Sequence, residues 1–288
     1  MLTSNTCPES LRADLGEVNV VPVDPTADAT YDAVAALLAE WRAIFPDEAL
    51  HLGADEVQYP CWNNSAAIRS YMAAHGLKTL EELEASFWAR VRKESPSLQE
   101  ATGSGGNRTA NATANSSPAP VVVASAAVFW QEILERVPAS LARGDIVEVW
   151  DNRTRMLDVL AAGHRALLAD GWYLDKQVPV DGRTSWFWVD TWRDMYLVDP
   201  TKGLNLSTAQ AKRVLGGEAC MWSEQVDEHT FDTRVWPRAC AVAERLWSPA
   251  HVVDLVDASS RLIVHRCRMV AKGIGASPIW ADACIVLD

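Results

Sequence analysis

Apolar residues recur along the chain with two spacings, one typical of helices and one typical of buried strands. Between residues 27 and 45 they fall at positions i, i+3, i+4 and i+7 with acidic residues opposite, which predicts an amphipathic helix. Pro46 ends this pattern, and the apolar run from Ala49 to Gly53 then predicts a short buried strand. This strand leads directly into Asp55 and Glu56.

Four further apolar runs predict strands, and helical or irregular stretches separate them: Val121 to Trp130, Ile146 to Trp150, Arg165 to Ala169 and Glu218 to Trp222. Helices are predicted over Ser65 to His75, from Thr79 onward with Glu82 in capping-box register, and over Thr233 to Trp247 and Val252 to Lys272. This alternation of strand and helix favours an α/β fold with a parallel sheet. Residues 102–119 are of low complexity and predict a disordered surface insertion.

Composition and charge narrow the class of protein. The chain has 288 residues, of which 49% are hydrophobic and 22% charged, proportions that exclude wholesale disorder, collagen and coiled coil. The net charge of −12 repels phosphate backbones and anionic lipid, so nucleic acid is not expected as a partner. No apolar run approaches the roughly 20 residues of a membrane span, and the N-terminus lacks the pattern of a signal peptide.

Glycosylation sequons and cysteines give a different indication of the compartment. Sequons begin at six positions, Asn63, Asn107, Asn111, Asn115, Asn152 and Asn205, and would matter only in a secretory compartment. The six cysteines contain no CxxC pair, so no metal site is expected. Cys7 with Cys61 and Cys267 with Cys284 flank two segments, which allows two disulfides with Cys220 and Cys240 as core thiols, although spacing alone leaves other pairings open.

Asp55 and Glu56 are the first candidates for chemistry. In a parallel α/β architecture, sites form at the carboxyl ends of strands, where this pair is predicted to lie. Two crowded carboxyl groups do not both ionise freely, so one of them stays protonated and can act as a general acid. The alternative interpretation is a solvated turn, which is the commoner setting for an isolated Asp-Glu pair.

Aromatic residues end three of the apolar runs in the same way, at Trp130, Trp150 and Trp222. They fit either core packing or the walls of a sugar-binding pocket. Polar residues follow two of the apolar runs: Tyr173 and Asp175 come after the run from Arg165 to Ala169, and Glu224 comes two residues after Trp222. Because the chain contains no GxGxxG, Walker, GxSxG or HExxH motif, aromatic walls with several carboxylates indicate a carbohydrate ligand.

The residues themselves resemble a known family. Residues 51–57 read His-Leu-Gly-Ala-Asp-Glu-Val and are followed by Cys-Trp at 61–62, which resembles the His-x-Gly-Gly-Asp-Glu signature of family 20 glycoside hydrolases, the β-N-acetylhexosaminidases. The family order continues with Phe-Trp-Gln-Glu at 129–132, Val-Trp at 149–150, Trp-Tyr-Leu-Asp at 172–175, Gly-Gly-Glu-Ala-Cys-Met-Trp-Ser-Glu at 216–224, Trp-Pro-Arg-Ala at 236–239 and Ala-Glu-Arg-Leu-Trp at 243–247. The strongest likeness is to eukaryotic lysosomal hexosaminidase chains.

This resemblance implies a (β/α)8 TIM barrel. About 50 residues precede the signature, which in the family ends the fourth strand, so we expect residues 1–288 to be a partial catalytic domain with strands 4–8 and without the N-terminal half. Ala54 stands where the signature has its second glycine, which adds a methyl group beside the acidic pair.

The resemblance also implies a substrate-assisted mechanism in which no enzyme side chain is the nucleophile. Glu56 would act as acid and then base, and Asp55 would orient the substrate's acetamido group. Further roles are implied for substrate-binding residues: a box of Trp130, Trp150 and Trp222, a hydrogen bond from Tyr173, and sugar hydroxyls held by Asp175 and Glu224.

The likeness implies the disulfides Cys7–Cys61 and Cys267–Cys284, no cofactor, and a lysosomal or secreted location. The substrate would be a glycan or glycoconjugate with terminal β-N-acetylhexosamine, and the assembly either a homodimer or a monomer. Two hypotheses follow: an exo-β-N-acetylhexosaminidase, or a truncated and inactive chain that acts at most as a sugar-binding or interaction module.

Overall fold

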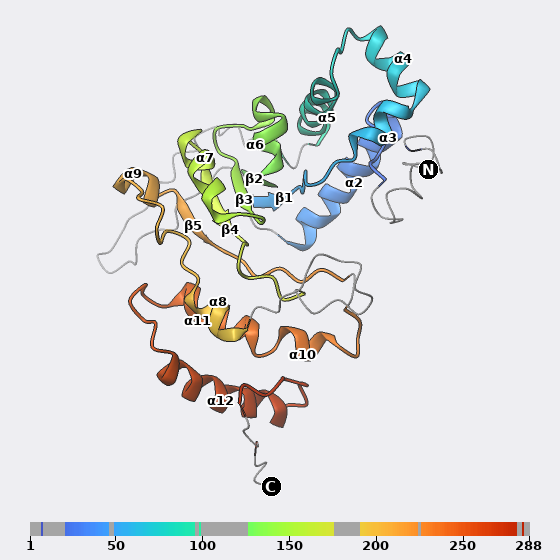
Figure 1. Cartoon of the computed structure of the whole chain (residues 1–288). Helices are drawn as coiled ribbons and strands as arrows, with labels where there is room; N and C mark the ends of the chain where they lie inside the picture. The colour runs from blue at the N-terminus through green and yellow to red at the C-terminus, as the bar shows by residue number, and fades with distance from the viewer. Residues whose placement is uncertain are drawn as a thin grey trace, which may run out of the picture. The chain divides into compact units, whose positions relative to one another are not determined.

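The computed structural model describes residues 7, 21–45, 49–95, 98, 126–175, 191–223, 226–280 and 284 (Figure 1). The predicted insertion at 102–119 lies outside the described residues. Five strands follow one another in the hydrogen-bonded order β1-β2-β3-β4-β5: β1 Ala49–His51, β2 Ala126–Trp130, β3 Ile146–Val149, β4 Arg165–Leu168 and β5 Val214–Gly217. Helices separate these strands along the chain, as predicted for an α/β fold. The chain divides into two compact units, residues 1–147 and 148–288.

The first unit combines the parallel pair β1 and β2 with helices α2 to α6 (Figure 1). These helices are α2 Asp28–Ile44, α3 Tyr59–Asn64, α4 Ala66–Ala74, α5 Leu80–Glu94 and α6 Glu132–Arg136. All five residues of β2 are buried, and Trp62, Ile68 and Leu83 form a core cluster under α3, α4 and α5. Burial of this apolar surface is what holds the helices beside the strands.

Polar side chains cap the starts of two helices in this unit. The Ser65 hydroxyl accepts a hydrogen bond from the Ile68 N–H at 3.4 Å at the start of α4. Thr79 and Glu82 form the predicted capping box at the start of α5. In α2, Tyr31 is buried near the first turn, whereas Leu37 and Ile44 are 60% and 62% exposed. The predicted amphipathic helix is therefore present, with the second half of its apolar stripe exposed.

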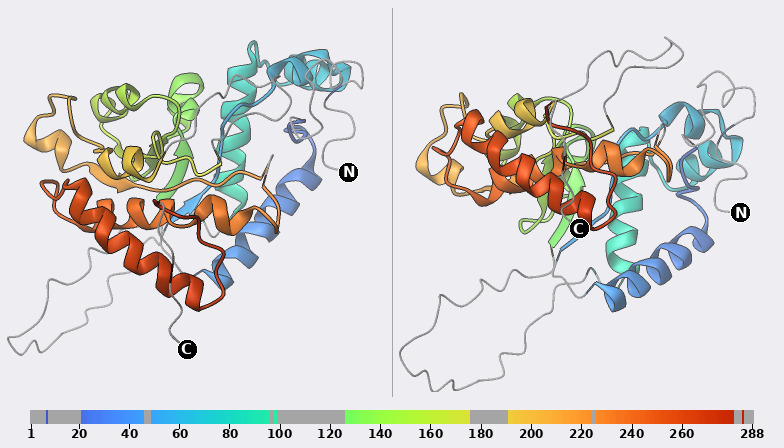
Figure 2. Two further views of the ribbon diagram at one scale, coloured as in Figure 1. Left: turned by 60° about the horizontal axis from the view of Figure 1, so that its bottom comes forward. Right: turned by 90° about the horizontal axis from the view of Figure 1, so that it is seen from below.

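The second unit contains the parallel pair β4 and β5 with helices α7 to α12. The bounds of these helices are α7 Met156–Ala161, α8 Trp192–Leu197, α9 Thr208–Ala211, α10 Phe231–Val235, α11 Arg238–Trp247 and α12 Leu255–Ala271. Helices α8, α11 and α12 are neighbours in this unit (Figures 1 and 2). They share one core cluster of Trp192, Tyr196, Ala241, Ala258 and Leu262. Short 3-10 turns at Pro138–Ser140 and Arg153–Arg155 complete the described elements.

Two predicted elements differ from the structure. The last strand is Val214–Gly217, not Glu218–Trp222, because only glycine fits where β5 meets β4: a Cβ on Gly217 would lie 2.0 Å from the Leu168 carbonyl oxygen. The helix predicted over 233–247 is divided into α10 and α11 at Pro237, which has no N–H to continue a helix. In the described part of the chain, no helix has both the length and the apolar character needed to cross a membrane.

Candidate active site

The acidic pair predicted from the sequence lies in the loop that follows β1. Leu52 N–H donates to the Val128 carbonyl at 2.8 Å and Trp130 N–H to the Gly53 carbonyl at 2.9 Å, so the loop begins as a continuation of the β1–β2 ladder. Asp55 is half-buried and Glu56 is exposed at the end of this ladder. The structure therefore places both carboxylates beyond the carboxyl end of a parallel strand, where sites form in α/β folds.

Left-handed backbone gives this loop its shape. Gly53, Ala54 and Glu56 have φ values of +75°, +78° and +43°. Glycine adopts such values freely, whereas a residue with a Cβ is strained there, and strain of this kind concentrates at functional sites.

An ion pair between Arg136 and the buried Glu84 supports the same loop. Arg136 in α6 donates to the Ala54 carbonyl at 2.6 Å and lies 3.3 Å from Glu84, which is only 1% exposed. Tyr59 donates a 2.6 Å hydrogen bond to Glu84 as well. Burial, reinforced by this bond to an anionic acceptor, raises the pKa of Tyr59. The loop is thus held by a charged network that is itself fixed to α5.

A cavity of about 510 Å³ adjoins this loop within the first unit. Asp55 and Glu56 line it together with His51, and its opposite wall is apolar, formed by residues of α2 and α5. His51 stacks near Trp130, with ring centroids 4.7 Å apart, and its Nδ1 accepts from the Gly53 N–H at 3.1 Å. His51 therefore supports the loop, whereas the two carboxylates have access to the cavity.

The second unit brings together several of the other predicted residues. Tyr173 forms an isolated parallel bridge with Cys220, and Leu174 N–H donates to the Cys220 carbonyl at 2.7 Å. The Trp150 ring centroid lies 6.4 Å from that of Tyr173. Trp222 is 40% exposed and follows this bridge by two residues. An aromatic surface with one phenol group results, which suits the C–H face and the polar groups of a sugar ring.

The Tyr173 phenol stays protonated at physiological pH. Burial raises its pKa most, the charge environment of Cys220, Asp175 and Glu148 raises it further, and a hydrogen bond from Trp222 opposes the shift. A neutral phenol retains its O–H donor, so Tyr173 can donate a hydrogen bond to a ligand oxygen. Burial also raises the pKa of the Cys220 thiol, which leaves it a poor nucleophile.

Glu148 is a site residue that sequence reasoning missed. It lies in β3, is fully buried, and acts electrostatically on both Tyr173 and Cys220. Asp175, only 5% exposed, belongs to the same electrostatic group. The available signal was a carboxylate within the apolar run Ile146 to Trp150, a pattern in which a charged residue is costly and calls for a specific reason.

Of the remaining predicted residues, the structure describes Trp130 and the four paired cysteines but not Glu224. Trp130 ends β2 and is 6% exposed, so most of its ring belongs to the core of the first unit. Glu224 lies outside the described residues. The disulfides Cys7–Cys61 and Cys267–Cys284 are both present, with Cys220 and Cys240 as free thiols. Cys61 lies in α3, so the first disulfide anchors the segment that follows the acidic pair.

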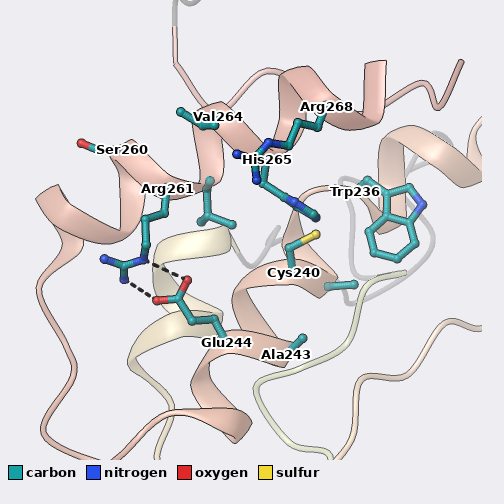
Figure 3. Close-up of a pocket in the computed structure, with 11 residues that line it drawn as sticks. Trp236, Cys240, Ala243, Glu244, Ser260, Arg261, Val264, His265 and Arg268 are labelled. Carbon is teal, nitrogen blue, oxygen red and sulfur yellow. Dashed lines mark hydrogen bonds and ion pairs between the residues drawn. The ribbon is translucent and has the colours of Figure 1, made fainter. Parts of the chain in front are cut away.

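A larger cavity of about 920 Å³ lies between α11 and α12 (Figure 3). Its walls are mainly apolar, and its one carboxylate, Glu244, points toward Arg261 and accepts a hydrogen bond from it, as Figure 3 shows. Among the described residues, no group of three or more His, Cys, Asp or Glu side chains could hold a metal ion.

Comparison with known proteins gives the same assignment for both units. The family model described as "Glycosyl hydrolase family 20, catalytic domain" matches residues 4–103 and 110–250. The chain is 35% identical over 270 residues to β-hexosaminidase subunit beta of Felis catus, which covers 91% of this chain and 44% of the relative. The human subunit beta is also 35% identical, over 269 residues, covering 91% of this chain and 42% of the relative. The chain thus spans less than half the length of these relatives.

Solved structures agree with the family model. The chitobiase of Flavobacterium johnsoniae is 27% identical with a TM-score of 0.65, covering 90% of this chain and 34% of that one. A β-N-acetylhexosaminidase from Streptomyces coelicolor A3(2) is 23% identical with a TM-score of 0.61, and the match covers 93% of this chain and 47% of that one. At this identity the likeness is one of fold. These neighbours confirm the α/β class and the (β/α) barrel architecture, of which the five strands form a part. By its motifs, its fold and the length of the match, the chain belongs to glycosyl hydrolase family 20.

Proposed function

We propose that this protein hydrolyses terminal, non-reducing β-linked N-acetylhexosamine residues of glycoconjugates. The observation that carries the proposal is the Asp55–Glu56 pair, which lies at the end of a parallel strand and lines a cavity. Family membership and 35% identity to β-hexosaminidase subunits support the substrate class. The reaction would be that of a glycosidase with two neighbouring carboxylates and no cofactor.

The proposed reaction is substrate-assisted and retaining. Glu56 donates its proton to the glycosidic oxygen as the bond to the anomeric carbon breaks, and the acetamido oxygen of the substrate attacks that carbon from the other face. Asp55 accepts a hydrogen bond from the acetamido N–H and stabilises the positive charge that develops there. Glu56, now a carboxylate, then takes a proton from the water that opens the ring intermediate.

The local geometry of the first unit supports these two roles. Glu56 is exposed, so its carboxyl group can reach a glycosidic oxygen, whereas Asp55 is half-buried and held close to the loop backbone. Arg136 fixes the carbonyl of Ala54, the residue before Asp55. A carboxylate whose backbone is fixed in this way loses little entropy on orienting a substrate group.

Further roles are proposed for substrate-binding residues. Tyr173 would donate its phenol proton to the acetamido oxygen, and Trp150, Trp222 and Trp130 would contact the sugar and its N-acetyl group. Asp175 and Glu224 would accept hydrogen bonds from sugar hydroxyls. The raised pKa of Tyr173 and its proximity to Trp150 support the part played by the phenol.

We also propose that residues 1–288 belong to one catalytic barrel domain with a surface insertion at 102–119. A lysosomal or secreted location is supported by the two disulfides and the similarity to β-hexosaminidase subunits. The word subunit in the names of these relatives supports an assembly of more than one chain over a monomer, and a homodimer is the simplest such assembly.

The experiment is release of nitrophenol from 4-nitrophenyl N-acetyl-β-D-glucosaminide at acidic pH by the purified chain. We expect Glu56→Gln to lower kcat by about 10²- to 10⁴-fold, the usual contribution of general acid–base catalysis. Glu40→Gln is the matched control, since Glu40 is exposed on α2, and it should leave the rate unchanged. The α-anomer should not be cleaved.

Two results would contradict this proposal. One is turnover that Glu56→Gln leaves intact. The other is a folded chain without turnover, which would favour the sugar-binding module instead, and binding of N-acetylglucosamine measured by calorimetry would then identify that module.

A further inference from the structure

We propose that a cavity of about 360 Å³ in the second unit is a binding site for a tetrahedral oxyanion, a phosphate or sulfate group. The cavity lies among α8, α10, the start of α11 and residues 277–279. It is distinct from the residues assigned to the reaction and does not depend on the proposed function.

Three arginines line this cavity: Arg193 from α8, Arg234 from α10 and Arg238 from the first turn of α11. Among the described residues that line it, none is an aspartate or glutamate. The concentration is notable because the chain as a whole has 38 acidic and only 26 basic residues. Three cations around one small volume repel one another unless an anion lies between them, so the arrangement favours a bound anion.

The hydrogen-bond donors of two of these arginines remain available. Within the described ranges, no carboxylate or carbonyl oxygen accepts a hydrogen bond from the guanidinium group of Arg193 or Arg234. Arg193 makes only cation–π contacts, 5.4 Å from the Trp192 ring and 5.8 Å from the Trp280 ring. Arg234 is half-buried, and a half-buried guanidinium without an acceptor is costly.

The carboxylates nearest in sequence are committed to other groups. Asp194 accepts hydrogen bonds from the N–H and the hydroxyl of Thr191, at 2.9 and 2.6 Å. Asp232 accepts from the Gly275 N–H at 2.9 Å. They cap backbone or hydroxyl groups, and within the described residues neither forms an ion pair with the cavity arginines.

Arg238 has a different task from the other two. Its guanidinium donates to the carbonyls of Arg234, at 2.7 and 3.0 Å, and of Leu174. It therefore contributes charge to the cavity while its donors hold backbone, and it links the cavity to the segment that carries Tyr173 and Asp175. Arg193 and Arg234 are left to bind the ligand.

This donor set selects the class of ligand. Guanidinium groups pair with sulfate and phosphate through parallel N–H···O bonds, and several cations favour a dianion over a monovalent carboxylate. Trp236 and Pro237 supply an apolar wall beside the arginines, which would accommodate the carbon skeleton of an ester. Both a free inorganic ion and a sulfate or phosphate ester of a sugar carry the required group.

The test is calorimetric titration of the whole chain with sodium sulfate and with sodium phosphate, at an ionic strength held constant with sodium chloride. We expect saturable binding of one ion per chain, with a Kd at least tenfold higher in Arg193→Gln and in Arg234→Gln. Arg143→Gln removes the same charge from an exposed loop of the first unit and should bind as the unaltered chain does. Arg234→Lys, which keeps the charge but not the paired donors, should fall in between.

Circular dichroism establishes that each variant is folded before it is titrated, and Arg193 is exposed, so its replacement leaves the fold intact even if Arg234 proves structural. Equal binding by all variants, non-saturating heats, or preference for acetate over sulfate would overturn the proposal. Titration with N-acetylglucosamine 6-sulfate distinguishes the sources: binding tighter than that of inorganic sulfate indicates a sugar ester as ligand, and weaker binding indicates the free ion.

Discussion

Ala54 shows how a single methyl group bears on the candidate site. It has φ +78° and is buried in the loop that carries the acidic pair, although an alanine in the left-handed region is strained by about 1–2 kcal/mol. We predict that Ala54→Gly stabilises the chain by about 0.5–1 kcal/mol, since relief of strain exceeds the added entropy of the unfolded glycine. Urea unfolding at pH 7 measures this.

The control for that substitution is Ala89→Gly in the middle of α5, where the backbone is helical and the side chain exposed. Glycine there should destabilise by about 1 kcal/mol. Destabilisation of similar size at position 54 would show that the left-handed conformation of Ala54 carries no strain.

We expect Asp175 to limit the charge that a sugar bound at the proposed site can carry. It is 5% exposed and lies close enough to Tyr173 to influence its pKa, so an anionic sugar bound there would meet a buried like charge. We predict that 4-nitrophenyl N-acetyl-β-D-glucosaminide is cleaved with a higher kcat/KM than its 6-sulfate. Asp175→Asn should reduce the ratio of the two kcat/KM values by about tenfold. Asp158→Asn, at an exposed position of α7, should leave that ratio unchanged. Equal cleavage of both substrates by the unaltered chain would rule out this role.

At the scale of elements, the contact between β4 and β5 depends on Gly217. A Cβ there would lie 2.0 Å from the Leu168 carbonyl oxygen and 2.3 Å from Trp172 Cζ3, distances that no packing adjustment of a side chain alone relieves. We predict that Gly217→Ala destabilises the second unit by about 3 kcal/mol, as expected for overpacking where two strands approach closely. Tryptophan fluorescence during thermal unfolding would report it.

Gly144→Ala is the matched control, because a Cβ at Gly144 meets no atom within 4 Å. Its melting temperature should change little. A Gly217→Ala chain that melts with the control would mean that β4 and β5 do not approach as closely as the register of Leu168 with Gly217 indicates.

The same contact explains which elements the sequence could predict. The start of α5 followed from Thr79 and Glu82 alone, because a capping box is made by residues three positions apart. The position of β5 did not, since it depends on the approach of Gly217 to a strand some 50 residues earlier in the chain. Apolar periodicity continued across residues 233–247, and the structure divides it at Pro237.

Some residues of the candidate site could likewise be predicted from the sequence, and others could not. Asp55 and Glu56 could be predicted because they directly follow a recognisable strand and belong to a family signature. The grouping of Glu148 with Tyr173 and Cys220 could not, because it joins side chains from three segments with no common spacing. Residues that lie next to one predicted element can thus be identified from the sequence. Electrostatic interactions between side chains of distant segments can be identified only once the fold is known.

For the whole molecule, acidity is the condition that tests the fold most directly. Burial alone would raise the pKa of Asp199, but hydrogen bonds from Thr201 and the charge of Arg245 outweigh it and lower the pKa. In Glu244, burial is likewise outweighed by hydrogen bonds from Arg261 and Tyr196, and the pKa is lowered. Arg245 Nη2 lies 2.9 Å from Asp199, and the Tyr196 hydroxyl donates to Glu244 at 2.7 Å. These pairs join α8, α11 and α12.

A carboxyl group whose pKa is lower in the folded chain binds protons more readily when the chain is unfolded. Its contribution is therefore fully present above the unfolded pKa of about 4 and is lost as the pH falls through the folded value. We predict that the contribution of these two groups to the free energy of unfolding is fully present above about pH 4 and is lost as the pH falls further, through their lowered folded-state pKa values. Asp199→Asn should cost about 2 kcal/mol at pH 7 and progressively less as the pH falls below about 4, because protonation removes the same charge. Urea unfolding over a series of pH values measures this cost, and Asp158→Asn is expected to parallel the unaltered chain. A constant cost for Asp199→Asn would mean that packing, not ionisation, holds these helices together.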